Sequence, residues 1–433
     1  MKYYSTNNSD HQVNLKDAVI KGLAPDQGLY MPQNIPQLDK TVVDSFRYKS
    51  FQEIGYEVIG ALFVEDLSPA QIKELVDHTL VFDAPNVEIE KDIFSLELFH
   101  GPTLAFKDFG ARFCSKLMSM LQSKSEKIVR VLVATSGDTG SAVANGFLGV
   151  KGVEVIILFP KGKVSVLQEK QFTTLGQNIT ALEVDGVFDD CQDLVKKAFT
   201  DSELNERLIL TSANSINIAR WIPQCLYYFY AFSRLPKSDK KVVFAVPSGN
   251  FGNISAGILA QRMGLPIDQF VAATNLNKVI PEYLQGAEFK KMTSLPTISN
   301  SMDVGNPSNF PRLLALYQQD EEELKRNVKG FFYSDEETIS TMKRVRDKGY
   351  MLDPHGAVGY LGLKDFLKTH SDYQGVFLET AHPGKFRETV EKALDLKLTL
   401  PERLAAFMDG EKEVIAMGND FEAFKSYLKS IED

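Results

Sequence analysis

From about residue 128 onward, short apolar segments alternate with segments of helical pattern. The apolar segments are nearly continuous in valine, isoleucine, leucine and phenylalanine, and each ends in a polar loop. Strands of a parallel sheet that is covered on both faces by helices have this pattern. We therefore predict an α/β fold with two doubly wound sheets. The strand-like segments lie within residues 128–135, 153–160, 179–186, 208–214, 241–250, 269–275 and 375–383.

A chain of 433 residues is too long for one hydrophobic core, so we expect more than one domain. We predict an N-terminal, mainly helical module over residues 1–92. Residues 93–240 form the first α/β unit in this prediction. Residues 241–433 form the second unit, whose last part is a helical extension.

Two helices are expected inside the N-terminal module. Residues 51–63 have the apolar spacing of an amphipathic helix, and a second such segment covers residues 67–80. The second begins with Ser68 and Pro69, a capping residue followed by proline in the first turn.

The overall composition argues against several kinds of function. A net charge of -9 does not suit general nucleic-acid binding, which needs a basic surface. Three widely spaced cysteines form neither a disulfide framework nor a metal motif, and no two histidines pair at a spacing of four, so we expect no metal. No apolar segment approaches 18 residues, and the N-terminus lacks a signal peptide, so we expect no membrane contact and a cytoplasmic location.

Two glycine-containing loops lie between a predicted strand and a predicted helix. The sequence PSGNFGN (247–253) would turn backbone N–H groups toward one point at a helix N-terminus, where an anion such as phosphate binds well. TSGDTGS (135–141) has the same context and suits a second anion, such as a carboxylate. Each loop taken alone could equally be a capped turn. A third strand end, ETAHPG (379–384), is a weaker candidate, and we interpret His382 there as a loop histidine.

Lys107 is an unusual lysine because apolar residues precede it in the segment TLAFKDFG (103–110). A solvated lysine has a pKa of about 10.4, and an apolar setting favours the neutral amine that attacks carbonyl groups. Alone, it could also be a helix-start lysine with its ammonium group in water. Together with two anion-binding loops, it predicts a ligand with both an aldehyde and a phosphate. Pyridoxal phosphate is that ligand.

Several segments, in this order, resemble the threonine synthase family, in particular the longer subfamily of bacteria and fungi. They begin with an N-terminal YST element, Tyr4 to Thr6, and together span nearly the whole chain. The resembling segments are ELFHGPTLAFKDFG (97–110), ATSGDTGSAVA (134–144), LQEKQF and TLG (167–176), SANSINIAR (212–220), PSGNFGN (247–253) and TAHPGKF (380–386).

This resemblance implies the tryptophan synthase β-like architecture, fold type II of pyridoxal-phosphate enzymes. It implies that Lys107 forms the Schiff base with the cofactor and is the catalytic residue. The implied cofactor contacts are Lys107, Asp138, Ser248, Gly249, Asn250, Phe251, Gly252, Asn253 and Thr380. The implied substrate contacts are Thr103, Ser136, Thr139, Asn214, Ser215 and Arg220. Related shorter enzymes often have asparagine where Asp138 stands.

The resemblance also implies a reaction, the conversion of O-phospho-L-homoserine and water to L-threonine and phosphate. The expected assembly is a monomer or a homodimer. Two other functions stay open at this point. One is a different pyridoxal-phosphate lyase, such as a threonine or serine dehydratase, which would not need Arg220 for a substrate phosphate. The other is a non-catalytic protein that binds phosphorylated ligands.

Overall fold

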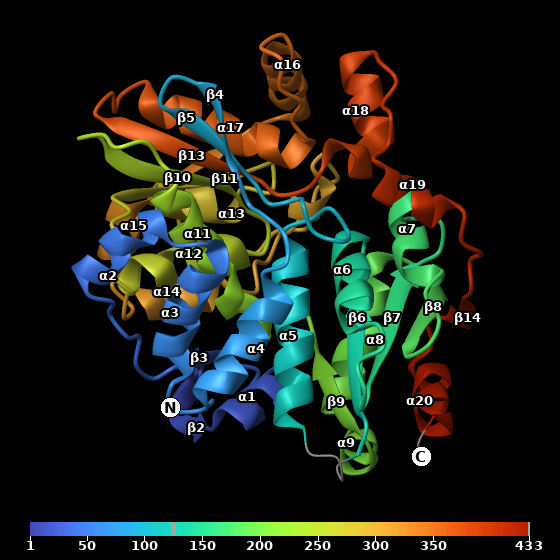
Figure 1. Ribbon diagram of the computed structural model, residues 1–433. Coiled ribbons are helices and arrows are strands. Elements are labelled where there is room, and N and C mark those ends of the chain that lie inside the picture. Colours follow the sequence, from blue (N-terminus) through green and yellow to red (C-terminus); the bar gives the residue numbers. More distant parts are fainter. Residues whose placement is uncertain (123–126, 432–433) are drawn as a thin grey trace.

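The computed structural model describes residues 1–122 and 127–431 and contains two large sheets that lie beside each other (Figure 1). This confirms the predicted α/β fold with two helix-covered sheets. The first sheet has the order β14 (Ile415–Gly418), β8 (Ile179–Asp185), β7 (Val153–Pro160), β6 (Val129–Ala134) and β9 (Ile209–Ser212). The second has the order β12 (Val328–Phe332), β11 (Gln269–Thr274), β10 (Lys241–Pro247), β13 (Tyr373–Glu379), β5 (Ile93–Glu97) and β4 (Asn86–Glu90).

All strand pairs of the first sheet are parallel. Its central strands are buried on both faces because alternate side chains enter different cores. Leu132 and Ile156 pack on the side of α8 (Phe188–Thr200), together with α20 (Phe421–Ser430). Val131 and Val155 belong to the large core on the other side, where α6 (Asp138–Phe147) and α7 (Val166–Thr173) lie.

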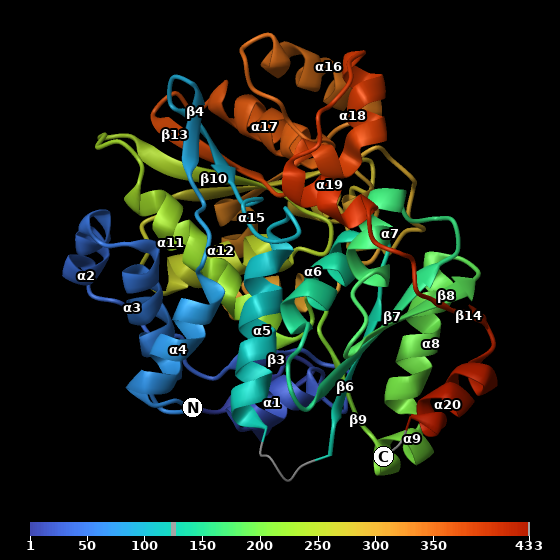
Figure 2. The ribbon, with the colours of Figure 1, turned by 45° about the vertical axis from the view of Figure 1, so that its right-hand side comes forward.

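The second sheet is parallel except at its edge, where β4 runs antiparallel to β5. One face packs against α17 (Pro354–Leu367), which contacts β10, β11, β12 and β13. The other face joins the large core, next to α11 (Cys225–Ser233) and α12 (Gly252–Arg262). Figure 2 shows α17 with α16 (Asp335–Arg346) and α18 (Arg387–Leu394) above this sheet.

The N-terminal region contains the two predicted helices, α3 (Phe51–Phe63) and α4 (Pro69–Thr79). Each begins with a capping box, formed by Ser50 with Glu53 and by Ser68 with Gln71. The region also contains a small antiparallel sheet, which the sequence pattern did not indicate because the middle of the chain segment 8–13 is polar. Its order is β2 (Asn8–Val13), β1 (Tyr3–Ser5) and β3 (Tyr30–Pro32).

Strand pairing crosses the predicted boundaries of the α/β units. Strands β4 and β5 come early in the chain but pair beside β13, in the sheet of the second unit. Strand β14, from the C-terminal extension, pairs with β8 in the first sheet. The chain therefore enters the second sheet, passes to the first, returns to the second and ends in the first. Other described helices are α1 (Leu15–Lys21), α2 (Lys40–Ser45), η1 (Phe46–Tyr48), α9 (Ser202–Arg207), η2 (Ile222–Gln224), α13 (Val279–Leu284), α14 (Phe310–Leu316), α15 (Glu321–Asn327) and α19 (Glu402–Met408).

Helix α5 (Lys107–Leu121) follows β5 and packs closely against the short helix α10 (Ile218–Trp221). The contact depends on Gly110. A Cβ atom at this glycine would lie 2.8 Å from the carbonyl oxygen of Arg220 and 2.9 Å from its Nε. Because one of these neighbours is backbone, the two helices could not keep this distance with a larger residue.

We predict that Gly110→Ala lowers the melting temperature, since forced overpacking costs about 1–3 kcal/mol. Gly60 in α3 is the matched control, because no atom lies within 4 Å of its would-be Cβ. Gly60→Ala should raise stability by about 0.4–1 kcal/mol by restricting the unfolded chain. Thermal unfolding followed by circular dichroism measures both. Equal shifts in the two variants would contradict the close packing of α5 on α10.

Candidate active site

The predicted site residues lie where strands of both sheets end. Lys107 follows β5, and the loop 135–141 follows β6. The segment 213–220 follows β9, the loop 248–253 follows β10, and Thr380 follows β13. Ligands of open α/β sheets bind beyond the carboxyl ends of the strands. The fold therefore collects segments far apart in the chain into one region.

Hydrogen bonds and ion pairs join these segments directly. The backbone N–H of Phe106 donates to the carbonyl of Thr380 over 2.9 Å, which places Thr380 beside the start of α5. Lys385 lies in η4 (Pro383–Phe386), five residues after Thr380. Its Nζ is 3.0 Å from Oδ1 of Asp138. The amide of Asn309 donates to the hydroxyl of Ser215. Contacts across both sheets thus surround one site.

Lys107 is the first residue of α5 and is partly exposed. Desolvation by the surrounding protein lowers its pKa to about 8; the charge of Asp138 opposes this, while Lys385 and Arg220 add to it. The Nζ makes no hydrogen bond or ion pair with any described residue, although it lies 6.0 Å from the centre of the Phe106 ring. About a tenth of this amine is therefore neutral at pH 7, far more than for a solvated lysine, and the neutral amine is the form that acts as a nucleophile.

A strained turn positions Lys107. Leu104 adopts a left-handed conformation with φ of 57°, which is uncommon for a residue other than glycine. Its carbonyl accepts a hydrogen bond from the backbone of His382, and Ala105 forms an isolated bridge with Ala381. The turn is thereby fastened to the end of β13. The side chain of His382 caps the N–H of Gly384, in agreement with its interpretation as a loop histidine.

Thr380 is buried, and its hydroxyl makes no hydrogen bond within the described part of the chain. It is thus available to a ligand. Thr103 differs in this respect, because its hydroxyl already donates to Asp108 over 2.6 Å and its backbone N–H binds the same carboxylate. Thr103 therefore shapes the turn before α5.

The side chain of Thr135 holds the backbone of the loop 135–141 in place. The Thr135 hydroxyl accepts hydrogen bonds from the backbone of Gly137 and Gly140. The backbone N–H groups of Ser136 and Thr139 have no hydrogen-bond acceptor among the residues that the structure describes. Because these groups stand at the N-terminus of α6, they form a suitable site for an anion.

Asp138 is the first residue of α6 and is almost completely buried. Burial alone would raise its pKa, but the charges of Lys385 and Lys107, with hydrogen bonds from Gln168 and Lys385, outweigh this and hold the pKa well below its usual range. Nε2 of Gln168 donates to Oδ1 over 2.9 Å. Asp138 is therefore an ionised carboxylate inside the site.

The loop 248–253 presents a row of backbone donors. Ser248 is tied down, since its N–H donates to Ala273 and its hydroxyl to Val246. From residue 249 to residue 253, no backbone N–H has an acceptor among the described residues. Phe251 adopts a left-handed conformation with φ of 61°, which turns the chain into α12. Such a nest of N–H groups at a helix N-terminus binds phosphate.

The glycines of this loop have different surroundings. A Cβ atom at Gly249 would lie 2.8 Å from Cα of Met302, so the loop residues of η3 (Asn300–Met302) need this glycine for close packing. At Gly252 the nearest atoms would be 3.4 Å away, which is ordinary contact. Asn253 supports the loop by donating its amide to the carbonyl of Pro247. The Asn250 side chain is exposed and accepts hydrogen bonds from Ser308.

Arg220 is a buried cation that forms no ion pair with any carboxylate of the described chain. One guanidinium nitrogen donates to the carbonyl of Ala213, whereas its Nε has no hydrogen-bond partner. Burial lowers the pKa of Arg220 from its ordinary value. The buried amide oxygen of Asn214 also lacks a partner among the described residues. A buried cation without a carboxylate partner among the described residues is a suitable place for an anionic ligand.

Besides Gln168, sequence reasoning missed four residues that contact Asp138 or support its contacts. Ser301 donates its hydroxyl to Oδ2 of Asp138 over 3.4 Å. The backbone N–H of Ser301 is in turn bound by His355, whose other ring nitrogen faces Asp353 at 2.6 Å. Of these four residues, only Lys385 lies in a quoted motif, TAHPGKF. Its basic side chain next to the candidate loop 379–384 was a signal that could have been used.

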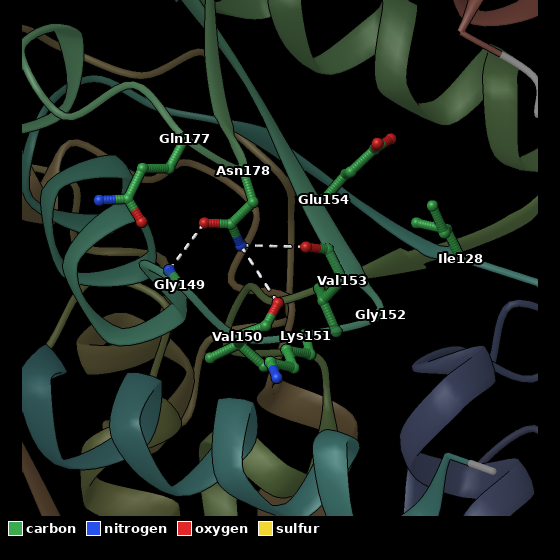
Figure 3. Close-up of a pocket in the computed structure, with 9 residues that line it drawn as sticks. All are labelled: Ile128, Gly149, Val150, Lys151, Gly152, Val153, Glu154, Gln177 and Asn178. Carbon is green, nitrogen blue, oxygen red and sulfur yellow. Dashed lines mark hydrogen bonds between the residues drawn. The ribbon is translucent and has the colours of Figure 1, made fainter. Parts of the chain in front are cut away.

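A separate hollow lies at the opposite end of the first sheet (Figure 3). It is formed near the amino ends of β6, β7 and β8, and Asn178 closes the turn there by donating to the carbonyls of Phe147 and Val153. None of the predicted site residues lines it. Within the described ranges, no cluster of three histidine, cysteine or acidic side chains could hold a metal, and no helix is long and apolar enough to cross a membrane.

The residues present fit pyridoxal phosphate. The amine of Lys107 has the lowered pKa that bond formation with an aldehyde needs. The free N–H groups of 249–253 match a phosphate, and the unbonded hydroxyl of Thr380 is available at a third position. These three features would hold the cofactor at its aldehyde, phosphate and ring.

Comparison with known proteins gives the same assignment. A model described as pyridoxal-phosphate dependent enzyme matches residues 72–377. Models for the threonine synthase N terminus and C-terminal region match residues 2–80 and 356–428. Threonine synthase of Haemophilus influenzae is 44% identical over 429 residues, which cover 99% of both chains.

Two solved structures are similar over the whole chain. Threonine synthase from Escherichia coli has a TM-score of 0.92 and 41% identity, covering 99% of this chain and 100% of that one. The pyridoxal-phosphate-bound threonine synthase from Brucella melitensis has a TM-score of 0.93 and 34% identity, covering 100% and 99%. The chain therefore belongs to the threonine synthase family of pyridoxal-phosphate-dependent enzymes.

Proposed function

We propose that the chain converts O-phospho-L-homoserine and water to L-threonine and phosphate. The observation that supports this best is Arg220, a buried guanidinium with no acidic partner in the described chain and an unpartnered Nε. Leaving a charge uncompensated in the interior is costly. A dianionic substrate phosphate would compensate it, and the planar guanidinium can bind phosphate through two parallel hydrogen bonds.

Three anion sites divide the ligands between them. The N–H groups of residues 249–253 bind the phosphate of the cofactor. Arg220, with Asn214 and Ser215, binds the phosphate of the substrate. The hydroxyl and N–H groups of Ser136 and Thr139 bind the substrate carboxylate at the N-terminus of α6.

When bound, pyridoxal phosphate supplies an electron sink that makes protons near the substrate amine removable. The Nζ of Lys107 would hold the cofactor and, once freed by the substrate amine, would take the proton of the α carbon. A proton of the β carbon is removed next, phosphate leaves the γ carbon, and a proton delivered to the γ carbon makes it a methyl group. Water then adds its hydroxyl group at the β carbon, its remaining proton goes to the departed phosphate, and Lys107 returns a proton to the α carbon. Arg220 stabilises the departing phosphate, where charge develops.

Thr380 contributes through the nature of its side chain. A hydroxyl group beside the ring nitrogen, in place of a carboxylate, does not stabilise a proton there. This favours elimination over transamination in our proposal. Thr103 acts indirectly, because its hydroxyl and N–H hold Asp108 at the start of α5.

The experiment that tests the proposal is a product assay. The loaded enzyme is incubated with O-phospho-L-homoserine, and threonine and phosphate are measured. We expect equal amounts of the two products. Formation of pyruvate or 2-oxobutyrate with ammonia from L-serine or L-threonine, without activity on the phosphorylated substrate, would instead support a dehydratase. Binding without turnover of either substrate would support a non-catalytic protein.

We predict that borohydride reduction of the cofactor-loaded chain attaches the cofactor to Lys107 and that Lys107→Ala removes this label. The reason is the partly neutral Nζ, whose pKa is lowered to about 8. Lys116→Ala is the matched control on the same helix, because Lys116 pairs with Glu74 at the surface. Peptide mass spectrometry locates the label. An equivalent label on another lysine in the Lys107→Ala chain would refute the assignment.

We predict that Arg220→Ala lowers kcat/KM for O-phospho-L-homoserine by about 30-fold or more, since removing one partner of a desolvated charge pair costs about 2–5 kcal/mol. Arg220→Lys should retain part of this activity. Cofactor content should not change, because the cofactor phosphate has its own N–H groups at 249–253.

Arg112→Lys is the control for the arginine-to-lysine change. Arg112 is half-buried on α5 and donates to the carbonyl of His78, away from the proposed ligands. It should leave kcat/KM unchanged. Near-normal kcat/KM in Arg220→Ala would remove Arg220 from the substrate site and favour the dehydratase alternative.

A further inference from the structure

Lys385 is a completely buried lysine close to the proposed Schiff-base residue. Its Nζ lies 3.0 Å from Oδ1 of Asp138. The same nitrogen donates to the carbonyl of Thr103 over 2.8 Å and to Oε1 of Gln171 over 3.1 Å. These three acceptors account for all three hydrogens of an ammonium group. The geometry therefore fits a charged Lys385 whose donors are all used.

Both carboxylate oxygens of Asp138 have partners other than Lys107. Its Oδ1 receives Lys385 and Gln168, and its Oδ2 receives the hydroxyl of Ser301. Lys107 has no ion pair with this carboxylate. Two lysines thus lie near one buried carboxylate, and only Lys385 is paired with it.

We propose that Lys385 is a positioning residue for Lys107: as the permanent counter-ion of Asp138, it keeps that carboxylate from pairing with Lys107 and leaves the Lys107 amine free to react. The inference rests on the proposed role of Lys107. Without Lys385, the carboxylate of Asp138 would lie uncompensated in a desolvated site close to Lys107, and its charge favours the protonated and unreactive form of the amine.

The charged groups that face Lys107 come from three elements. They are Asp138 at the start of α6, Lys385 in η4 and Arg220 in α10. Asp138 raises the pKa of Lys107, whereas Lys385 and Arg220 lower it. Asp108, the next residue in the chain, is held by Thr103. Loss of Lys385 therefore removes one lowering charge and frees the raising one, so both changes raise the pKa of Lys107.

The test measures the reactivity of Lys107 in the full-length chain freed of cofactor. Acetic anhydride is added at pH 7, and mass spectrometry gives the acetylation rate of Lys107 relative to the exposed Lys237. Each pKa unit changes the neutral fraction about tenfold. We expect Lys385→Met to slow acetylation of Lys107 about tenfold and Asp138→Asn to accelerate it several-fold. The double variant should lie within about threefold of the original chain.

A purely structural role for Lys385, as a tie between Thr103 and Gln171, predicts a different result. In that case Lys385→Met destabilises the chain but leaves the relative acetylation rate of Lys107 within about twofold. Asp138→Asn then does not accelerate the acetylation of Lys107. Either finding would overturn the proposal. If Lys385→Met does not fold, Asp138→Asn decides alone, and a rate that is not increased would refute the inference.

This test separates the inference from the proposed function. Attachment of the cofactor to a different lysine on borohydride reduction would refute the role of Lys107. The acetylation rates would still show whether Lys385 controls the charge of Lys107.

Discussion

The ion pair between Asp138 and Lys385 connects the two sheets at the site. Asp138 begins the helix that follows β6 of the first sheet, and Lys385 follows β13 of the second. Both side chains are almost completely buried, so neither charge would be stable there without the other. Lys385 also donates to Thr103 and Gln171, which brings in the turn before α5 and helix α7. The position of Lys107 depends on this set of contacts.

The two proposed phosphate positions differ in the groups that they offer to a ligand. The loop 248–253 offers only backbone N–H groups and helix-terminal charge, which suits a phosphate that stays bound. Arg220 offers a full charge with an unpartnered nitrogen, which suits a phosphate that arrives and leaves. This difference supports a fixed phosphorylated cofactor beside a phosphorylated substrate.

The sequence predicted the parts of the fold that have strong local patterns. Most of the buried parallel strands overlap their expected segments, for example β7 at Val153–Pro160, whereas β5, β12 and β14 were not expected from the sequence. Helices α3 and α4 begin at recognisable capping residues. Lys107 and the anion loops were found because their residue types need a particular setting. These features depend on neighbours in the chain, which a sequence displays directly.

Long-range pairing was not predictable in the same way. The strand β5 places Lys107 by pairing with β13, almost 300 residues later, and no local signal indicates that partner. The left-handed conformations of Leu104 and Phe251 were also missed, because neither residue is a glycine. Ser301 reaches Asp138 only through a loop held by His355. Such contacts are set by tertiary packing, so the spacing of residues does not reveal them.

A crystal structure of the chain grown with pyridoxal phosphate tests the central claim most directly. We expect electron density that is continuous from the cofactor to Nζ of Lys107, with the cofactor phosphate against the N–H groups of residues 249–253 and Arg220 left open. Density joined to another lysine, or a cofactor phosphate bound by Arg220, would contradict this account.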